Sequence, residues 1–556
     1  MKRFLLAAVA FWLVVASSAG SSAQSDPHTP PLSPKAASLF KTSEECVACH
    51  NGLRTSDDED VSIGTLWRST IMANSARDPY FHAGLRREVV DHPSQAADIQ
   101  HECAGCHAPM LQRTAHLDGR SADLLSQLPI RADDARPEHR LAADGVSCAV
   151  CHQIAAERLG TRESFNGQFS MAATGPDARQ AFGPYPVNAG RARIMRSVTG
   201  FAQTEAPHIR ESALCATCHT LYTKARDASG TVVGEFPEQM NFQEWQHSAF
   251  YGEQRSCQSC HMPDVPGRAR VASVLGEPRE GLSRHLFVGG NFLVLRMLDR
   301  YRTSLGVEAP SAALEATASA TIRQLQADTA TVALLSERRR DAVVAEVTVR
   351  NLTGHKFPTG YPSRRSWIHL TARDEQGRVV FESGAPGADG AIVGNDNDRD
   401  ATMYEPHYGE LRRPDQVQIY ETIIADSGDA VTTGLLRATR YLKDNRLLPR
   451  GFDKATAHSD IAVHGEAGTD PTFTGDGDRV RYLLPTVTAD IHVELRYQPI
   501  AFRWAENLRA YDAPEPRRFV DYFAAMAADS SIVVAQARGR AGNATATVTA
   551  GAVRPR

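Results

Sequence analysis

The chain has 556 residues, of which 42% are hydrophobic and 23% charged, with ten cysteines and a formal net charge of −4. This length and composition are typical of a folded protein and exclude a short disulfide-bonded scaffold. The slightly acidic balance disfavours nucleic acid as a partner.

The first 23 residues have the pattern of an export signal. Two basic residues precede an apolar run, Phe4–Ala16, and Ser21 and Ala23 stand at the −3 and −1 positions before Gln24. An uncleaved anchor is the alternative, but the apolar run is too short to span a bilayer comfortably. We therefore expect residues 1–23 to be a signal peptide and the mature protein to be periplasmic, with the cell surface as a second destination.

All ten cysteines fall in five copies of one pattern, Cys-x-x-Cys-His. In chain order, motifs 1 to 5 are Cys46, Cys49 and His50; Cys103, Cys106 and His107; Cys148, Cys151 and His152; Cys215, Cys218 and His219; and Cys257, Cys260 and His261. This spacing is the attachment signature of c-type haem, in which two thiols bond the vinyl groups and the histidine ligates the iron. Zinc sites use paired sets at short spacing, whereas the gaps between these motifs are irregular. The pattern predicts five covalently bound haem c groups.

The motifs end at His261 and no cysteine follows. We expect a pentahaem cytochrome c domain over 36–305, mainly helical or irregular, because porphyrins supply apolar area that side chains otherwise provide. Apolar spacing predicts helices over Ile63–Asn74, Pro79–Val90 and Asn291–Tyr301. A connecting helix is predicted within 306–330, over Ser311–Ala327, after Pro310.

Beyond the connecting helix the periodicity changes. Alternating runs predict strands over Asp341–Arg350, Ser366–Arg373, Arg378–Ser383 and Asp490–Gln498. Short strands between Gly, Pro and Asp clusters favour an immunoglobulin-like β-sandwich over 335–530, ending in helices over Ala501–Tyr511 and Pro516–Ala527. The tail 537–556, rich in Gly, Ala, Thr and Arg, is predicted to be disordered. The expected fold class is α+β.

Several segments resemble the multihaem cytochromes c of the cytochrome c552/c554-related group. They are 66–92 (LWRSTIMANSARDPYFHAGLRREVVDH), 145–154 (GVSCAVCHQI), 214–223 (LCATCHTLYT), 244–263 (EWQHSAFYGEQRSCQSCHMP) and 285–292 (HLFVGGNF). The stretches 354–360 (GHKFPTG) and 441–453 (YLKDNRLLPRGFD) recur in the same architectural type. The resemblance covers most of residues 40–525. Its proteins are usually bis-histidine electron carriers or relatives of multihaem reductases, so it implies haem binding and leaves the reaction open.

Five irons need five axial ligands besides the motif histidines. The resemblance, carried over residue by residue, implies His92, His208, His247, His285 and His355 as these distal ligands. His355 also lies in a Gly-His-x-x-Pro turn, a rigid mount for one imidazole. The second-rank candidates are His82, His101, His116 and His407, and Met72 is a candidate thioether ligand or a packing residue. For each histidine the alternative is an ordinary surface or hydrogen-bonded imidazole.

Two further patterns stand outside the haem motifs. The loop 395–400 (NDNDRD) resembles part of a calcium loop but lacks its central Gly and downstream Glu, which favours a solvated loop. Arg364 and Arg365 are candidates to clamp a haem propionate, and an ordinary surface pair is the alternative.

The sequence predicts an electron carrier rather than an enzyme, and no catalytic residue is assigned. Its expected partners are redox proteins, among them a membrane-associated quinol-oxidising partner. The alternative is a reductase of a small nitrogen or sulfur oxyanion, which needs one open iron with acid or cationic groups above it. Pentahaem nitrite reductases mark that haem with Cys-x-x-Cys-Lys, which this chain lacks, although an open site also arises with a histidine proximal ligand. A third hypothesis makes the sandwich a docking module.

Overall fold

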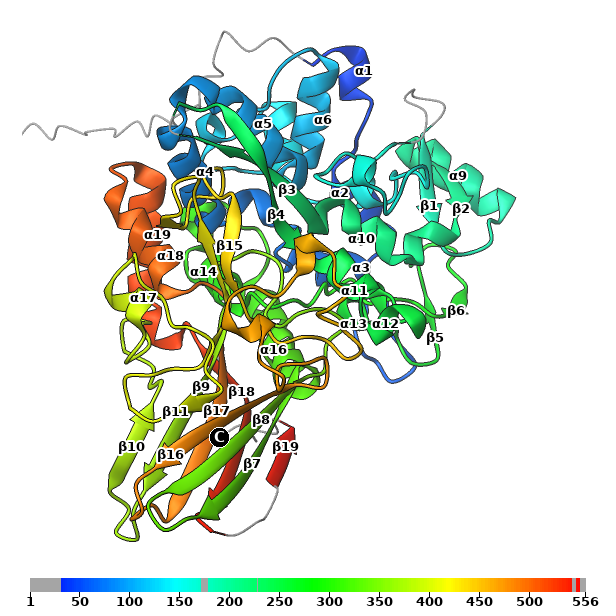
Figure 1. Cartoon of the computed structure of the whole chain (residues 1–556). Coiled ribbons are helices and arrows are strands. Elements are labelled where there is room, and N and C mark those ends of the chain that lie inside the picture. Colours follow the sequence, from blue (N-terminus) through cyan, green and yellow to red (C-terminus); the bar gives the residue numbers. More distant parts are fainter. Residues whose placement is uncertain (1–31, 172–178, 228, 543–546, 551–556) are drawn as a thin grey trace, which may run out of the picture. The chain divides into compact units, whose positions relative to one another are not determined.

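The structure is a computed structural model that describes residues 32–171, 179–227, 229–542 and 547–550 (Figure 1). The predicted signal peptide, 1–23, lies outside the described residues. Contacts from Leu32 onward group into one compact unit, so the predicted internal domain boundaries remain predictions. No helix in the described part of the chain is both long enough and apolar enough to cross a membrane.

Four of the five cysteine pairs lie within a helix: α5 (Ala96–His107), α8 (Cys148–Cys151), α10 (Ser212–His219) and α13 (Cys257–His261). In motif 1, Cys46 lies in α2 (Ser43–Val47) and Cys49 lies in the turn that follows it, where the N–H of His50 donates to the carbonyl of Cys46 at 3.0 Å. Residues three apart on a helix share one face, so a helical Cys-x-x-Cys presents both thiols in one direction. The local backbone therefore already sets the spacing that two vinyl groups require.

The structure confirms three predicted helices of this region and shortens a fourth. Helices α4 (Pro79–Asp91), α14 (Phe292–Arg300) and α16 (Ser311–Asp328) agree with the sequence pattern. Helix α3 covers only Ile63–Arg68. The Ser69 and Thr70 hydroxyls donate to the carbonyls of Leu66 and Trp67, and such local bonds compete with the helical ladder.

The remaining helices are short. They are α1 (Pro34–Ala37), α6 (Pro109–Leu117), α7 (Pro137–Ala143), α9 (Ala189–Thr199), α11 (Asn241–Gln246), α12 (Ala249–Gly252), α15 (Arg302–Leu305), α17 (Asp396–Arg399), α18 (Phe502–Glu506) and α19 (Pro514–Ala524). The motif region also holds three two-stranded sheets, formed by β1 (Gln180–Gly183) with β2 (Ala202–Glu205), β3 (Thr220–Arg226) with β4 (Val232–Met240), and β5 (Arg268–Arg270) with β6 (Pro278–Glu280).

Two five-stranded sheets dominate the C-terminal half. One has the order β10-β9-β17-β18, with β12 also paired to β9, and the other has the order β11-β16-β8-β7-β19 (Figure 1). Their bounds are β7 (Ala330–Arg338), β8 (Val343–Asn351), β9 (Arg365–Arg373), β10 (Val379–Ser383), β11 (Glu410–Leu411), β12 (Ile419–Tyr420), β16 (Asp478–Leu484), β17 (Asp490–Gln498), β18 (Ile532–Arg540) and β19 (Thr547–Ala550). A third sheet joins β13 (Thr422–Ala425) to β14 (Val431–Thr432) and β15 (Arg440–Asp444). The α+β class is therefore observed, and the immunoglobulin-like topology stays a prediction.

The C-terminal end differs from the disordered tail expected over 537–556. Residues up to Arg540 belong to β18, which pairs with β17, and β19 pairs antiparallel with β7. Pairing with strands far away in sequence stabilises these residues, and local composition does not reveal it. Residues 543–546 and 551–556 lie outside the described part.

The C-terminal helices pack against the motif region. Phe519 on α19 is fully buried, and its ring centre lies 4.9 Å from that of Tyr80 on α4. Beside them the guanidinium of Arg86 on α4 donates to both carboxylate oxygens of Glu515, at 2.8 and 3.0 Å. One hydrophobic core includes Tyr80, Phe519 and the buried face of the two large sheets.

Replacing Phe519 by alanine should cost about 3–5 kcal/mol in the free energy of unfolding, because it leaves a cavity between α19 and α4. Chemical denaturation of the haem-loaded protein measures this cost. The matched control is Val487→Ala, which truncates a side chain that is 60% exposed and should change stability by less than about 0.5 kcal/mol. Equal effects of the two substitutions would contradict this packing.

Candidate functional site

One cavity of about 1940 Å³ collects all five motifs. Its wall includes all ten cysteines and all five motif histidines. Sites for one small ligand usually measure roughly 300–1,000 Å³. The cavity is therefore large enough for several cofactors, and its wall carries the thiols and imidazoles that haem c requires.

Thiols of different motifs meet inside this cavity. The hydrogen-bonded pairs are Cys46 with Cys148, Cys106 with Cys218, and Cys215 with Cys257. Burial raises the pKa of Cys151, and the nearby Cys218 raises it further. Motif 1 thus adjoins motif 3, motif 3 adjoins motif 4, and motif 4 also adjoins motifs 2 and 5.

Four of the motif imidazoles have the same hydrogen bond on Nδ1. The Nδ1 atoms of His50, His107 and His152 lie 2.6, 3.2 and 2.5 Å from the carbonyl oxygens of Val271, Ser75 and Phe182, and that of His261 faces the carbonyl of Val288. A carbonyl oxygen only accepts, so Nδ1 carries the proton and Nε2 keeps its lone pair. This is the arrangement that orients metal-ligating histidines.

Two predicted distal ligands stand opposite motif histidines. The His285 ring centre lies 6.5 Å from that of His152, with the ring planes at 16°. The His355 ring centre lies 6.3 Å from that of His261, with the planes at 15°. Their Nδ1 atoms also face carbonyls, of Ser283 at 3.0 Å and Lys356 at 2.9 Å.

These separations fit two imidazoles that share one metal ion. A metal–imidazole bond is about 2.0–2.1 Å long and the nitrogen lies about 1 Å from the ring centre, so ligands on opposite sides of one ion have ring centres about 6 Å apart. Burial lowers the pKa of His285 and of His355 to about 4, so both rings are neutral at pH 7. Neutral imidazole is the form that binds a metal.

The other three predicted distal ligands are placed differently. His92, His208 and His247 are absent from the cavity wall. The Nε2 atoms of His208 and His247 are occupied by the carbonyls of Ile154 at 2.8 Å and Asp453 at 2.9 Å. The Nε2 of His92 is buried and has no hydrogen-bond partner among the described residues. The structure does not bring these three rings to a motif histidine, and their ligand role stays a prediction.

Two second-rank histidines do reach the cavity. His101 and His116 line its wall, with ring centres 5.9 Å apart. His101 comes two residues before motif 2, which is the one signal in the sequence that favours it. His82 does not line the cavity, because its Nε2 pairs with the carbonyl of Ala76 at 2.7 Å. Met72 lines the cavity as well.

The His219 site differs from those of His152 and His261. Among the described residues no second imidazole pairs with its ring in the way that His285 and His355 pair with theirs. Burial, together with the nearby His261 and Arg364, lowers the pKa of His219 to about 4. Arg364 lines the cavity and donates to the carbonyl of Thr359 at 2.7 Å. A fixed cation therefore lies beside an imidazole that lacks a partner ring.

Buried carboxyl groups line the cavity beside motif 2. Glu88 and Glu238 both lie close enough to Cys103 to raise its pKa, after burial. Burial raises the pKa of Glu238 to about 7, although a hydrogen bond from Thr223 opposes the shift. These groups give the cavity acidic positions at motif 2, and Arg364 gives it a basic position near motifs 4 and 5.

Arg365 and the loop 395–400 are bound by protein groups outside the cavity. Arg365 is buried and donates to Asp398 at 2.8 Å and to Gln498 at 2.8 Å, so only Arg364 of the predicted pair reaches the cavity. Asp398, in the loop 395–400, also accepts from the backbone of Ile392. The loop is thus partly buried and held by protein groups, which differs from the solvated loop expected.

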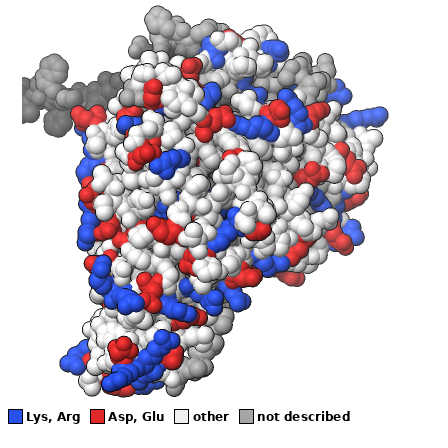
Figure 2. Space-filling view, in the orientation of Figure 1, with Lys and Arg blue, Asp and Glu red and all other residues white. Residues whose placement is uncertain are grey.

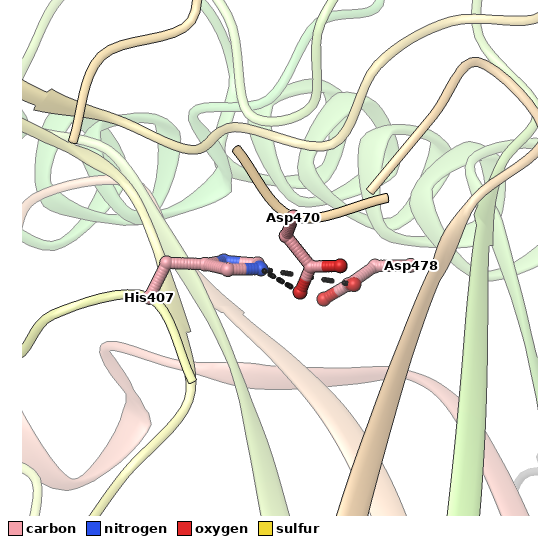
Figure 3. A group of neighbouring side chains, drawn as sticks. All are labelled: His407, Asp470 and Asp478. Atoms are coloured by element: carbon pink, nitrogen blue, oxygen red, sulfur yellow. Dashed lines mark ion pairs between the residues drawn. The ribbon is translucent and has the colours of Figure 1, made fainter. Parts of the chain in front are cut away.

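His407 belongs to a separate cluster with Asp470 and Asp478, whose ligand atoms lie within 4.8 Å of one another (Figure 3). The His407 Nδ1 accepts from the side-chain amides of Gln418 at 2.9 Å and Asn445 at 3.1 Å. Backbone N–H groups bind both amide oxygens and fix the amide orientations. The ring proton therefore sits on Nε2, 3.4 Å from Asp470, whereas a metal ligand needs the opposite tautomer. The cluster is a group of buried polar side chains in which the His407 Nε2 and one oxygen of Asp478 have no hydrogen-bond partner among the described residues.

Comparison with solved structures gives one match. The penta-heme cytochrome c552 from Thermochromatium tepidum aligns with a TM-score of 0.50 and 17% sequence identity, over 90% of this chain and 99% of that chain. The fold is that of a multihaem cytochrome c. Comparisons with protein families and with curated proteins found no match. The fold is therefore shared with a solved multihaem protein over most of both chains, at low sequence identity.

The pH dependence of stability should reflect Asp478. Burial raises its pKa from 3.8 to about 7. Because the folded-state value is the higher one, the protonated carboxyl favours the folded state at low pH, and that stability is lost as the pH rises towards 7. Between pH 5 and pH 9 the loss is about 3 kcal/mol.

Asp478→Asn keeps an acceptor for the Tyr420 hydroxyl and should remove this decrease in the free energy of unfolding. Unfolding by guanidinium at pH 5 and at pH 9 measures the difference. Asp476→Asn, two residues away and exposed, is the matched control and should behave like the wild type. An unchanged pH dependence in Asp478→Asn would show that Asp478 does not carry it.

Proposed function

We propose that the chain is an exported pentahaem c-type cytochrome that passes electrons between redox proteins. The observation that carries the proposal is the convergence of five Cys-x-x-Cys-His motifs on one cavity, with thiols of neighbouring motifs in contact. When bound, haem c supplies one-electron redox chemistry at iron. The chain's own residues attach the haems, ligate the irons, orient the ligating imidazoles and insulate the haems from one another and from solvent.

Each motif has a defined task in this proposal. The two cysteines hold the cofactor covalently, and the motif histidine ligates with Nε2 while its Nδ1–H is held by a backbone carbonyl. His285 and His355 complete motifs 3 and 5, because their free Nε2 atoms face those of His152 and His261. For the other motifs our proposed ligands remain His92, His208 and His247. Their side chains would have to turn towards the cavity to reach an iron there.

The thiol contacts support a continuous route for electrons. Motif 1 adjoins motif 3, which adjoins motif 4, and motif 4 adjoins motifs 2 and 5. The attachment points thus form a branched chain with motif 4 at its centre. Such a chain links separate points of the protein, which suits a carrier with distinct donor and acceptor sites.

Redox proteins are the proposed partners, among them a membrane-associated quinol-oxidising protein, and the periplasm is the proposed compartment. The export pattern of residues 1–23 supports that location. Figure 2 shows acidic and basic side chains interspersed over the face drawn. This mixed surface suits transient contacts with partner proteins more than nucleic acid, which a basic stripe would attract.

A second candidate function is reduction of a small nitrogen or sulfur oxyanion at motif 4. It is favoured by the Arg364 cation, which lies near His219 and near the His261–His355 pair. His219, like His50 and His107, has no facing imidazole among the described residues. A guanidinium can bind an anion and stabilise charge. The two functions differ in one countable property, since a carrier has five six-coordinate irons and a reductase has one open iron.

Intact mass and electron paramagnetic resonance of the secreted ferric protein test the proposal. We expect a chain starting near Gln24 with five covalent haems, and only low-spin signals. A mass with four or fewer haems, or an unprocessed N-terminus, would contradict it. One high-spin haem per chain, together with turnover of nitrite, hydroxylamine or tetrathionate, would favour the reductase instead.

Replacing His285 or His355 by alanine should each convert one low-spin haem to high spin while all five haems remain attached. Added imidazole should restore the low-spin signal, because the vacated position then accepts it. His458→Ala is the control, since that ring is exposed and does not line the cavity. Unchanged spectra in both variants would remove these residues from the ligand set.

A further inference from the structure

Four charged side chains form a buried ring at the base of the His355 turn. The ammonium of Lys356 donates to Asp444 at 2.7 Å, and the guanidinium of Arg446 donates to both oxygens of Asp444 at 2.8 and 2.7 Å. Arg446 also pairs with Glu244 at 2.9 Å. These side chains are at most 7% exposed. Two cations and two anions thus compensate each other away from water.

The ring closes through the turn itself. One oxygen of Glu244 accepts the backbone N–H of Lys356 at 3.1 Å and the hydroxyl of Thr359 at 2.5 Å. The same carboxylate therefore holds the turn both before and after the Phe357–Pro358 step. Because Lys356 directly follows His355, the imidazole is mounted on a peptide that the ring anchors.

That peptide also orients the imidazole. The carbonyl of Lys356 accepts from the Nδ1 of His355 at 2.9 Å, which turns Nε2 towards His261. On the other side, Thr353 and Asn351 bind the carbonyl oxygen of His355 at 2.9 and 2.7 Å. Every polar group that fixes the ring direction is thus tied either to the buried charges or to strand β8.

The ring joins the two halves of the haem site. Glu244 lies on α11, which packs against α10, and α10 in turn contacts α13, the helix that carries His261. Asp444 ends β15, in the C-terminal half. The charged ring therefore connects the helices that bear motifs 4 and 5 to the turn that presents His355.

We propose that the Glu244–Arg446–Asp444–Lys356 ring is a positioning device that holds His355 on its iron and excludes competing ligands. The proposal rests on the proposed ligand role of His355. Buried ion pairs are costly to desolvate, and removing one member leaves an uncompensated charge. A neutral turn would hold the backbone equally well, but the charged ring also resists displacement, because a shift of the turn would separate several buried charges at once.

Glu244→Gln and Asp444→Asn in the full-length, haem-loaded protein test this role, with cyanide as the probe. Loss of an outer-shell partner typically weakens a metal–ligand bond by about 10–100-fold, so one haem should bind cyanide at about 10–100-fold lower concentration. The midpoint potential of the same haem should rise, because removing a negative charge favours the reduced iron. The potential shift reports only the removed charge, whereas a merely structural role would not change cyanide binding at one haem alone.

Two further variants sharpen the experiment. Glu253→Gln removes a carboxylate nine residues from Glu244 whose ion pair with Arg450 is exposed, and it should leave cyanide binding unchanged. Thr359→Val keeps all four charges and removes one hydrogen bond to Glu244, so it should shift cyanide binding less, in the same direction. It keeps the test decisive if the charge variants fail to load haem.

His355→Ala separates failure of this inference from failure of the proposed ligand. If His355→Ala leaves all haems unchanged, the ligand assignment is wrong. If it opens one haem while Glu244→Gln, Asp444→Asn and Thr359→Val bind cyanide like the wild type, the ring does not position His355. If the charge variants load no haem and Thr359→Val behaves like the wild type, the ring is required only for folding, and the inference is again overturned.

Discussion

The arrangement of two thiols and one imidazole on a single helical turn is the constraint on which this structure depends. Cysteines three residues apart share a helix face, and the histidine that follows lies at the end of the same turn. Five such turns line one cavity, and most of the protein between them consists of short helices and irregular connections. Around the motifs the cavity takes the place of side-chain packing, whereas the two large sheets share a continuous hydrophobic core with α4, α14 and α19.

The second imidazole of a site comes from elsewhere in the fold. His285 lies in the loop before α14, and His355 lies in the turn after β8, yet both face a motif histidine at nearly the same distance and angle. For His355 this requires the C-terminal half to be held firmly against the motif helices. The buried ring of Glu244, Arg446, Asp444 and Lys356, together with the packing of α19 on α4, supplies that rigidity.

The five motifs are chemically unequal. Motifs 3 and 5 have a facing imidazole, motif 2 lies beside two buried carboxyl groups, and motif 4 lies beside the Arg364 guanidinium. Charge near an iron changes its potential and its affinity for anions, so these environments favour different tasks along one chain of attachment points. Motif 4 is the centre of the thiol contacts, and the Arg364 cation lies near it and near motif 5. Motif 4 is therefore the position at which a carrier and a reductase would differ most.

The sequence by itself determined the features that are local. The haem motifs could be predicted because both thiols and the imidazole are close neighbours in sequence. Helices α4 and α16 could be predicted because their apolar spacing and the proline at their start are also local features. His355 was expected as a ligand from the resemblance to multihaem cytochromes c, and its Gly-His-x-x-Pro turn is a local feature of the sequence. Residues 537–540 and 547–550 were expected to be disordered but belong to β18 and β19, whose partners β17 and β7 lie far away in sequence.

Only the tertiary structure decided which histidines face the cavity. His208 and His247 look as suitable in sequence as His285, but their Nε2 atoms are bound to the carbonyls of Ile154 and Asp453. His101 and His116 reach the cavity wall instead. A histidine can ligate a metal through either ring nitrogen. Long-range packing determines which of the two nitrogens is hydrogen-bonded to a carbonyl. No local pattern of residues encodes that choice, which is why ligand identity depends on the fold.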